Sequence, residues 1–207
     1  VSNSVEQINN YTKQIASLND QISRLTGASG GNAPNDLLDL RDQMATELNQ
    51  IANVEITMQE GSMSVSFSGG LSLVQGGTSY KLEAIPSSAN PQRLTVGYNR
   101  GSGAASEVPE GRITGGSLSG ILQFRSGALD NARNQLGQIA LSMADSFNKV
   151  QQAGVDLNGD LTSNEPFFTI GQPSSYANSN NSQAAGASIS ATYTDVSQTK
   201  ATDYRLE

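Results

Sequence analysis

The spacing of the apolar residues changes twice along this chain, and these changes restrict the possible folds more than any other feature of the sequence. From residue 8 to residue 25, apolar side chains recur at alternating intervals of three and four residues, as in a coiled-coil seam. They are Ile8, Tyr11, Ile15, Leu18, Ile22 and Leu25. This pattern predicts a helix over residues 5–26, which would be about 33 Å long at 1.5 Å per residue.

A second helix is predicted over residues 36–52. Gly27 and the ASGGNA stretch that follows it are typical of a turn, and Asp36 is a suitable residue to cap the start of the next helix. The apolar stripe of this helix is Leu37, Leu40, Met44, Leu48 and Ile51. Because the connection is short, the two helices should form an antiparallel hairpin.

The longest helical pattern covers residues 117–153, although Gly127 and Gly137 lie within it. Heptad spacing there relates Leu122, Leu129, Ala132, Leu136, Ile139, Met143 and Val150. Narrow stripes on three helices favour a slender bundle. We expect the following residues to be buried in that bundle: Leu18, Leu48, Leu136 and Ile139. Any part of the long helix that the bundle leaves uncovered is a candidate interaction surface.

Between the helices, residues 54–115 alternate apolar and polar side chains with a period of two. Glycine-rich stretches separate the alternating segments, and this combination is typical of short antiparallel strands joined by hairpins. Residues 61–80 contain no charged side chain. An uncharged strand edge is open to unwanted pairing, so we expect a partner to cover this stretch.

These patterns predict an α+β fold: an elongated antiparallel helical bundle with a β-rich insertion of short antiparallel strands, and a C-terminal extended segment that leads into a second β domain. We expect residues 1–155 to form the helical bundle domain, with residues 54–115 as its insertion. Residues 156–207 would be the extended segment and the start of the truncated second β domain. The chain does not begin with Met, and we interpret it as a piece of a longer protein.

The composition excludes several classes of function. Twelve Lys and Arg against 19 Asp and Glu give a net charge of −7 over 207 residues, so neither a nucleic acid nor an anionic membrane is an expected partner. The chain has no His and no Cys, which excludes Ser-His-Asp catalysis, thiol nucleophiles and zinc sites built on His or Cys. We therefore predict no catalytic residue, no cofactor and no metal site, and we do not expect an enzyme.

One segment resembles a cation site. The D-L-N-G-D sequence at residues 156–160 is similar to the beginning of a calcium-binding loop. Such a loop needs Gly at its sixth position and a bidentate Glu at its twelfth, where this chain has Leu161 and Phe167. A plain turn after the long helix is therefore the better interpretation.

Three further motifs are also better explained by structure than by chemistry. Asp36, Asp39 and Asp42 could form a carboxylate site, but steps of three residues drift by about 60° around a helix, so the three do not share one face. Helix capping and the helix dipole account for them. Gly116–Gly120 has Leu at its centre, where a nucleophile elbow needs Ser. Gly101–Gly103 lacks the third glycine of a dinucleotide-binding motif.

Four segments, taken in order, resemble a known family. They are NNYTKQIASLNDQI at residues 9–22, PNDLLDLRD at 34–42, GSLSGILQFR at 116–125, and AGVDLNG at 153–159 with Phe167 and Phe168 following. In this order they closely resemble the flagellar hook-associated protein 1 family of the bacterial hook–filament junction. The similarity runs over essentially the whole chain. The departures are Leu40, where the family usually has a more hydrophilic residue, and a loosely matched strand region.

The resemblance implies a non-enzymatic structural subunit of the flagellum, located outside the cell. Members of the family are exported unfolded through the flagellar type III secretion channel without a cleaved signal peptide, and the absence of cysteine suits that route. They assemble as a ring of axial subunits between hook and filament. The intact protein has terminal helices that coil together in the inner tube, and this chain lacks them.

The resemblance also implies partners. These are further copies of the protein in the ring, the hook protein on one side, and the second junction protein, hook-associated protein 3, on the filament side. An export chaperone would act through terminal regions that are absent here. No nucleic acid and no membrane is expected among the partners.

Two other classes of function remain open at this stage. A secreted adhesin or effector built on a helical hairpin would bind a protein partner through an exposed loop and would make no lateral contacts with itself. A glycan hydrolase would need two carboxylates about 5 to 9.5 Å apart in a cleft. The chain contains no Trp to line such a groove.

Overall fold

The computed structural model describes residues 1–101, 103–155, 157–159, 166–181 and 189–205. The chain forms two compact units: Val1–Gln123 with Asn178–Asn180, and Phe124–Ala177 with Asn181–Glu207. The first unit combines helices with antiparallel sheets, which confirms the predicted α+β class. The second unit contains most of the long helix and the C-terminal segment.

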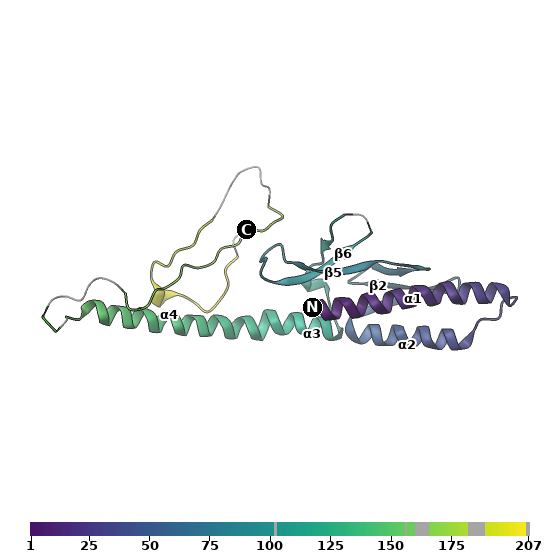
Figure 1. Cartoon of the computed structure of the whole chain (residues 1–207), viewed down its shortest axis with the longest axis horizontal. Coiled ribbons are helices and arrows are strands. Elements are labelled where there is room, and N and C mark those ends of the chain that lie inside the picture. Colours follow the sequence, from purple (N-terminus) through teal and green to yellow (C-terminus); the bar gives the residue numbers. More distant parts are fainter. Residues whose placement is uncertain (102, 156, 160–165, 182–188, 206–207) are drawn as a thin grey trace. The chain divides into compact units, whose positions relative to one another are not determined.

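The first unit is built on a helical hairpin, which Figure 1 shows as two adjacent antiparallel helices. Helix α1 spans Ser2–Ala28 and helix α2 spans Asn35–Ile51. The chain reverses through Gly30 and Gly31, which both have positive φ angles that other residues rarely adopt. The predicted burial of Leu18 and Leu48 is confirmed.

The start of α2 differs from the sequence-based expectation. The helix begins at Asn35, and the capping position is occupied by Pro34, whose fixed backbone angle suits a helix start. Asp36 therefore lies within the first turn and is not the cap. There its carboxylate is close to the positive end of the helix dipole, so its favourable contribution to the helix remains.

Two antiparallel sheets follow the hairpin. The four-stranded sheet has the order β1-β2-β3-β4, and the three-stranded sheet has the order β5-β6-β7. The strands are β1 (Val54–Gln59), β2 (Ser62–Phe67), β3 (Leu71–Gln75), β4 (Thr78–Ser79), β5 (Lys81–Pro86), β6 (Leu94–Asn99) and β7 (Ser106–Glu107). The Tyr98 hydroxyl on β6 donates to the Ser72 carbonyl on β3 at 2.7 Å, which joins the two sheets.

The core lies between the hairpin and the inner faces of the sheets. On β2 every second side chain is buried, namely Met63, Val65 and Phe67, and Leu73 and Val74 of β3 are buried as well. The lack of charge in residues 61–80 therefore has a cause within the chain. Much of this stretch packs against its own helices, and burying a charge there would be costly.

A buried polar network fixes the hairpin to the four-stranded sheet. The side-chain amide of Asn19 donates to the carbonyls of Met63 at 2.7 Å and Gly76 at 2.9 Å, and its oxygen accepts from the Met63 N–H at 3.0 Å. Arg41 on α2 donates to the same Asn19 oxygen at 3.1 Å and to the Gly61 carbonyl at 3.0 Å. One amide on α1 thus contacts α2, the beginning of β2 and the β3–β4 turn.

A second asparagine joins α1 to the other sheet. The Asn9 amide donates to the Leu82 carbonyl at 2.8 Å, and its oxygen accepts from the Leu82 N–H at 2.9 Å. A carboxamide carries one donor and one acceptor side by side, so it replaces the missing neighbour strand of β5 at this residue. Asn9 and Asn19 together set the position of α1 on both sheets.

The long helix predicted over residues 117–153 is present with one irregularity. Helix α3 (Gly116–Phe124) continues through a turn of π-helix, η2 (Arg125–Leu129), into α4 (Asp130–Ala153). Gly127 lies inside the π turn. At the beginning of α3, a Cβ atom on Gly116 would lie 2.5 Å from the Ile51 carbonyl oxygen, so only glycine allows α3 to start this close to α2.

The expected burial of Leu136 and Ile139 is wrong. These side chains of α4 are 69% and 66% exposed. Heptad spacing shows that a helix has an apolar stripe, but it does not show which chain covers the stripe. Short 3-10 turns complete the description, at Glu110–Arg112 before α3 and at Val196–Gln198 in the C-terminal segment.

We expect Asn19→Ala to lower the free energy of unfolding by roughly 2 to 4 kcal/mol, because it leaves the buried Arg41 guanidinium and the Met63 backbone without their partner. Urea unfolding followed by circular dichroism measures this. The control is Asn10→Ala, an exposed residue of the same helix, which should change the stability by less than about 0.5 kcal/mol. Equal effects of the two substitutions would show that the Asn19 network is not required.

A polar contact across the hairpin also predicts a pH dependence. The Tyr11 hydroxyl donates to Glu47 at 2.7 Å and the Gln43 amide donates to it at 3.0 Å, and these hydrogen bonds lower the pKa of the Glu47 carboxyl. A depressed carboxyl pKa stabilises the folded state above the unfolded pKa, and this contribution is lost as the pH falls through the folded pKa. We therefore expect Glu47→Gln to flatten the loss of stability on acidification.

Unfolding midpoints in urea between neutral and acid pH measure this difference. Glu6→Gln serves as the control, because it removes an exposed carboxylate of α1 and changes the net charge by the same amount. An acid-side slope for Glu47→Gln as steep as that of the parent chain would contradict the role of this contact.

Candidate assembly surface

The exposed apolar stripe of α4 is the strongest candidate for a functional surface. Its members recur at intervals of three or four residues on one side of the helix: Leu136, Ile139, Met143, Phe147 and Val150, each more than half exposed. From the first to the last, the stripe is about 21 Å long at 1.5 Å per residue. An exposed apolar seam of this length is typical of a surface that another helix covers.

The C-terminal segment packs on the other side of α4. Gln138 donates to the Thr199 carbonyl at 2.6 Å, and Asn134 donates to Asp203 at 3.4 Å. At about 100° per residue, these two positions lie opposite the stripe that contains Ile139 and Met143. The described residues of the segment thus lie on the polar face of the helix, and the side chains of the apolar face are exposed.

A third asparagine holds the other part of this segment. The Asn148 amide donates to the Phe168 carbonyl at 2.8 Å and accepts from the Phe168 N–H at 2.8 Å. This places the Phe168 ring edge-on to Phe147 and to Phe167, with centroids 5.8 and 4.9 Å away. The aromatic cluster extends the apolar surface at the C-terminal end of the stripe, because Phe147 and Phe167 are both largely exposed.

An ion pair lies on the polar face of α4. Lys149 pairs with Asp145 at 2.7 Å, one helical turn away. Hydrogen bonding to Asp145 and the charge of that residue raise the pKa of Lys149, so its ammonium remains charged through the neutral range. At about 100° per residue, Asp145 lies on the side of the helix that carries Gln138, so this ion pair stands apart from the apolar stripe.

The residues considered from sequence as chemical sites are not brought together. Asp36, Asp39 and Asp42 are exposed along α2, and the described residues contain no group of three or more acidic side chains placed to hold a metal ion. Gly101 and Gly103 belong to the loop between β6 and β7. The possible calcium loop cannot be compared, since Asp156, Asp160 and Leu161 lie outside the described residues.

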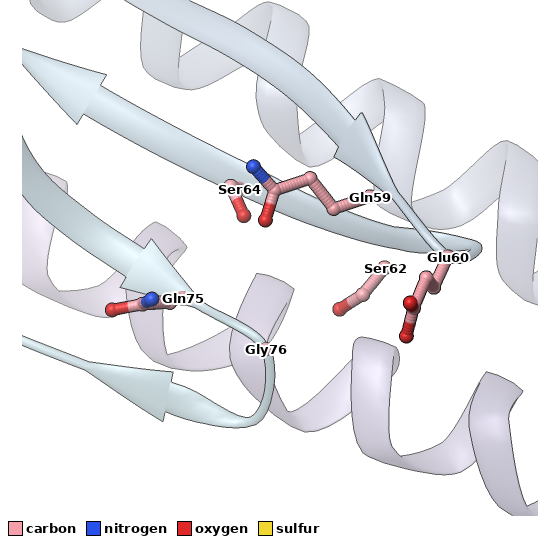
Figure 2. A pocket seen from close by; sticks show the side chains of 6 residues that line it. All are labelled: Gln59, Glu60, Ser62, Ser64, Gln75 and Gly76. Carbon is pink, nitrogen blue, oxygen red and sulfur yellow. The ribbon is translucent and has the colours of Figure 1, made fainter.

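A shallow concavity of about 520 Å³ lies at the end of the four-stranded sheet, between the β1–β2 turn and the β3–β4 turn. Figure 2 shows the residues that line it, which are Gln59, Glu60, Ser62, Ser64, Gln75 and Gly76. Glu60 is the one carboxylate in this set, whereas glycoside hydrolysis by the common mechanisms uses a pair. Its lining therefore does not match the hydrolase alternative.

The asparagine contacts were not predicted from the sequence. The apolar pattern of the two helices nevertheless marks two of the residues involved, Asn19 and Arg41. Asn19 lies four residues after Ile15 and three before Ile22, so it interrupts the apolar stripe of α1. Arg41 interrupts the stripe of α2 in the same way. Polar residues on a core stripe are usually paired, and this would have been a reason to place them together.

None of the helices in the described part of the chain combines the length and the apolarity that crossing a membrane requires.

Comparison with known proteins gives a consistent result. A family model described as the flagellar hook-associated protein FlgK helical domain matches residues 1–168. The chain is 52% identical to flagellar hook-associated protein 1 of Escherichia coli (strain K12) over 204 residues, which are 98% of this chain and 37% of that protein. It is 48% identical to the protein of the same name from Salmonella typhimurium over 207 residues, 100% of this chain and 37% of that protein.

A solved structure is similar over the same extent. The flagellar hook junction protein FlgK from Burkholderia pseudomallei matches with a TM-score of 0.85 and 38% identity, covering 97% of this chain and 35% of that chain. The chain therefore spans little more than a third of the length of the relatives that it matches.

The exposure of Leu136 predicts how a truncation there behaves. Leu136→Ala should change the free energy of unfolding by less than about 0.5 kcal/mol, because little apolar surface is exposed anew. Leu48→Ala, at a fully buried position, should cost about 2 to 5 kcal/mol. Urea unfolding of both variants is the measurement, and a large cost at Leu136 would mean that the stripe is buried when the chain is in solution.

Proposed function

The chain belongs to the flagellar hook-associated protein FlgK family, and we propose that it is part of a structural subunit of the bacterial flagellum that forms the junction between hook and filament. Its relatives are named flagellar hook-associated protein 1, and the similar solved structure is titled a flagellar hook junction protein. The names of these relatives give no support to the adhesin or effector alternative. In this role the protein is extracellular and acts by packing, not by catalysis.

The exposed stripe of α4 is the observation that carries this proposal. A chain that functions alone has no use for a long apolar seam in water, because such a seam promotes association. In a subunit of a packed assembly, such a seam serves as a contact surface. Helical segments of the same protein that lie outside this chain cover the seam, and the packing of whole subunits, axially and laterally, builds the junction.

The finer parts of the proposal follow the family resemblance. The subunits form a ring and contact the hook protein on one side and hook-associated protein 3 on the other. They reach this position through the flagellar type III channel without a cleaved signal peptide, and an export chaperone acts on regions outside this chain. Residues 1–155 form the helical bundle domain, with residues 54–115 inserted, and residues 156–207 lead into a second β domain.

The test replaces one residue of the seam in the full-length protein. Ile139→Asp should leave the circular dichroism and melting of the isolated chain nearly unchanged, because the side chain is exposed. A charge in a covered helical seam costs several kcal/mol, so the full-length variant should fail to restore motility to a strain that lacks the protein. Electron microscopy of hooks without filaments would locate the defect.

The matched control is Ser142→Asp, an exposed position of the same helix outside the seam. It introduces the same charge and should restore motility. Normal motility with Ile139→Asp would remove the α4 stripe from the assembly contacts.

A further inference from the structure

Strand β1 is an open edge of the four-stranded sheet. It pairs with β2 on one side, and the sheet order leaves its other side without a neighbouring strand. All residues from Glu55 to Gln59 are exposed. Two of them are apolar, with Ile56 40% and Met58 53% exposed. A strand edge with unpaired backbone groups and exposed apolar side chains is a template for another strand.

The contacts of β1 show which backbone groups point outward. The Val54 N–H donates to the Asn49 side chain at 3.1 Å, on the side away from β2. The Glu55 carbonyl accepts from the Ser66 hydroxyl of β2 at 3.5 Å, so it points inward. Because successive residues of an antiparallel strand point to alternate edges, Ile56 and Met58 direct their N–H and carbonyl groups outward.

The turn between β1 and β2 gives the same alternation independently. Glu60 and Gly61 form a two-residue turn with φ angles of 49° and 79°, as in a type I′ hairpin. In such a hairpin the residues that flank the turn, Gln59 and Ser62, exchange hydrogen bonds with each other. Counting back from Gln59 again places the groups of Met58 on the open edge.

Elsewhere in the chain, asparagine side chains bind the backbone N–H and carbonyl groups that have no neighbouring strand. Asn19 binds both backbone groups of Met63, Asn9 binds both of Leu82, and Asn49 takes the N–H of Val54. No contact within residues 1–101 is seen for the outward groups of Ile56 and Met58. They form an open window of two donors and two acceptors, limited by the Asn49 contact at one end and by the Glu60–Gly61 turn at the other.

We propose that a second copy of this chain occupies the window, with β1 pairing against β1 in antiparallel orientation around a twofold axis at Thr57. In this register Ile56 lies opposite Met58 of the second copy, and the reverse pair forms by symmetry. The two pairs use all four open groups of each copy in four hydrogen bonds. The two four-stranded sheets become one sheet of eight strands.

Charge and side-chain pattern support a second copy as the occupant. The register places Glu55 opposite Gln59 of the other copy and Thr57 opposite its equivalent, so no like charges face each other. The apolar side chains of Ile56 and Met58 from both copies gather on the face that carries the buried Val65. The window is therefore self-complementary, as a twofold interface has to be.

The contact is short, so the association is weak and reversible. It is also independent of the proposed function, because a ring with a single rotation axis contains only head-to-tail contacts between neighbours. The paired form belongs to folded chains that are not part of the assembly.

Sedimentation velocity from about 10 µM to about 1 mM tests the proposal, with a dimer fraction that rises with concentration as the expected result. Thr57→Lys places two like charges opposite each other at the twofold axis, on an exposed residue of β1, and should weaken the association at least about tenfold. Thr78→Lys places the same charge on β4, at the other edge of the same sheet, and should leave the association unchanged. A chain that stays monomeric over this range, or a dimer that Thr57→Lys does not weaken, overturns the proposal.

Amide hydrogen exchange at the two ends of this concentration range identifies the surface. The amides of Ile56 and Met58 should exchange freely in dilute solution and become protected in concentrated solution. The Thr57 amide, which faces β2, should be protected in both and is the internal reference. Equal exchange of the Ile56 and Met58 amides at both concentrations would mean that β1 is not the contact, whatever the sedimentation result.

Discussion

The shared contact of Asn19 and Arg41 is the constraint on which the rest of the first unit depends. Arg41 is 2% exposed, and the carboxylate of Asp42 lies 3.9 Å from its Nε atom. Burial lowers the pKa of the Arg41 guanidinium, and the charge of Asp42 offsets this only in part. A buried cation with so little compensation is costly, so its hydrogen bonds to Asn19 and Gly61 are needed to offset that cost. This requirement links helix α2, helix α1 and the β1–β2 turn in one arrangement and gives the apolar core a fixed register.

The three asparagine clamps extend the same principle along the chain. Asn9, Asn19 and Asn148 each bind the N–H and the carbonyl of one residue in an extended segment. A carboxamide has the donor and the acceptor of a peptide group, so it satisfies an unpaired backbone position without another strand. Each clamp specifies one residue, whereas apolar packing tolerates sliding by a residue pair. The asparagine side chains therefore set the position of α1 and α4 relative to the extended segments that they bind. Burial of apolar side chains supplies most of the free energy of folding.

The elements of the fold were accessible from sequence because they depend on local periodicity. The spacing of Ile8 to Leu25 and the alternation in residues 54–115 each specify an element and its inner face. The exposure of Leu136 and Ile139 could not be predicted in the same way, since an apolar stripe does not show which chain covers it. The start of α2 at Asn35 was missed because Asp36 is a good cap by residue type, while the backbone preference of Pro34 decides the position. The candidate surface on α4 followed from the same heptad pattern once the exposure of its residues was known.

The two units differ in how complete they are. The hydrophobic core of the described residues runs from Val5 to Leu122 and so lies within the first unit. In the second unit the C-terminal segment is attached through polar contacts such as Gln138 to Thr199 and Asn148 to Phe168. Hydrogen bonds of this kind contribute only about 1 kcal/mol each, because water competes for the same groups. Covering the apolar stripe would contribute more, at about 25 cal/mol for each Å² that is buried. The stability of the second unit therefore depends on the chain that covers the apolar stripe of α4. Burial of this stripe would join the subunit to its neighbours and would also stabilise α4 itself.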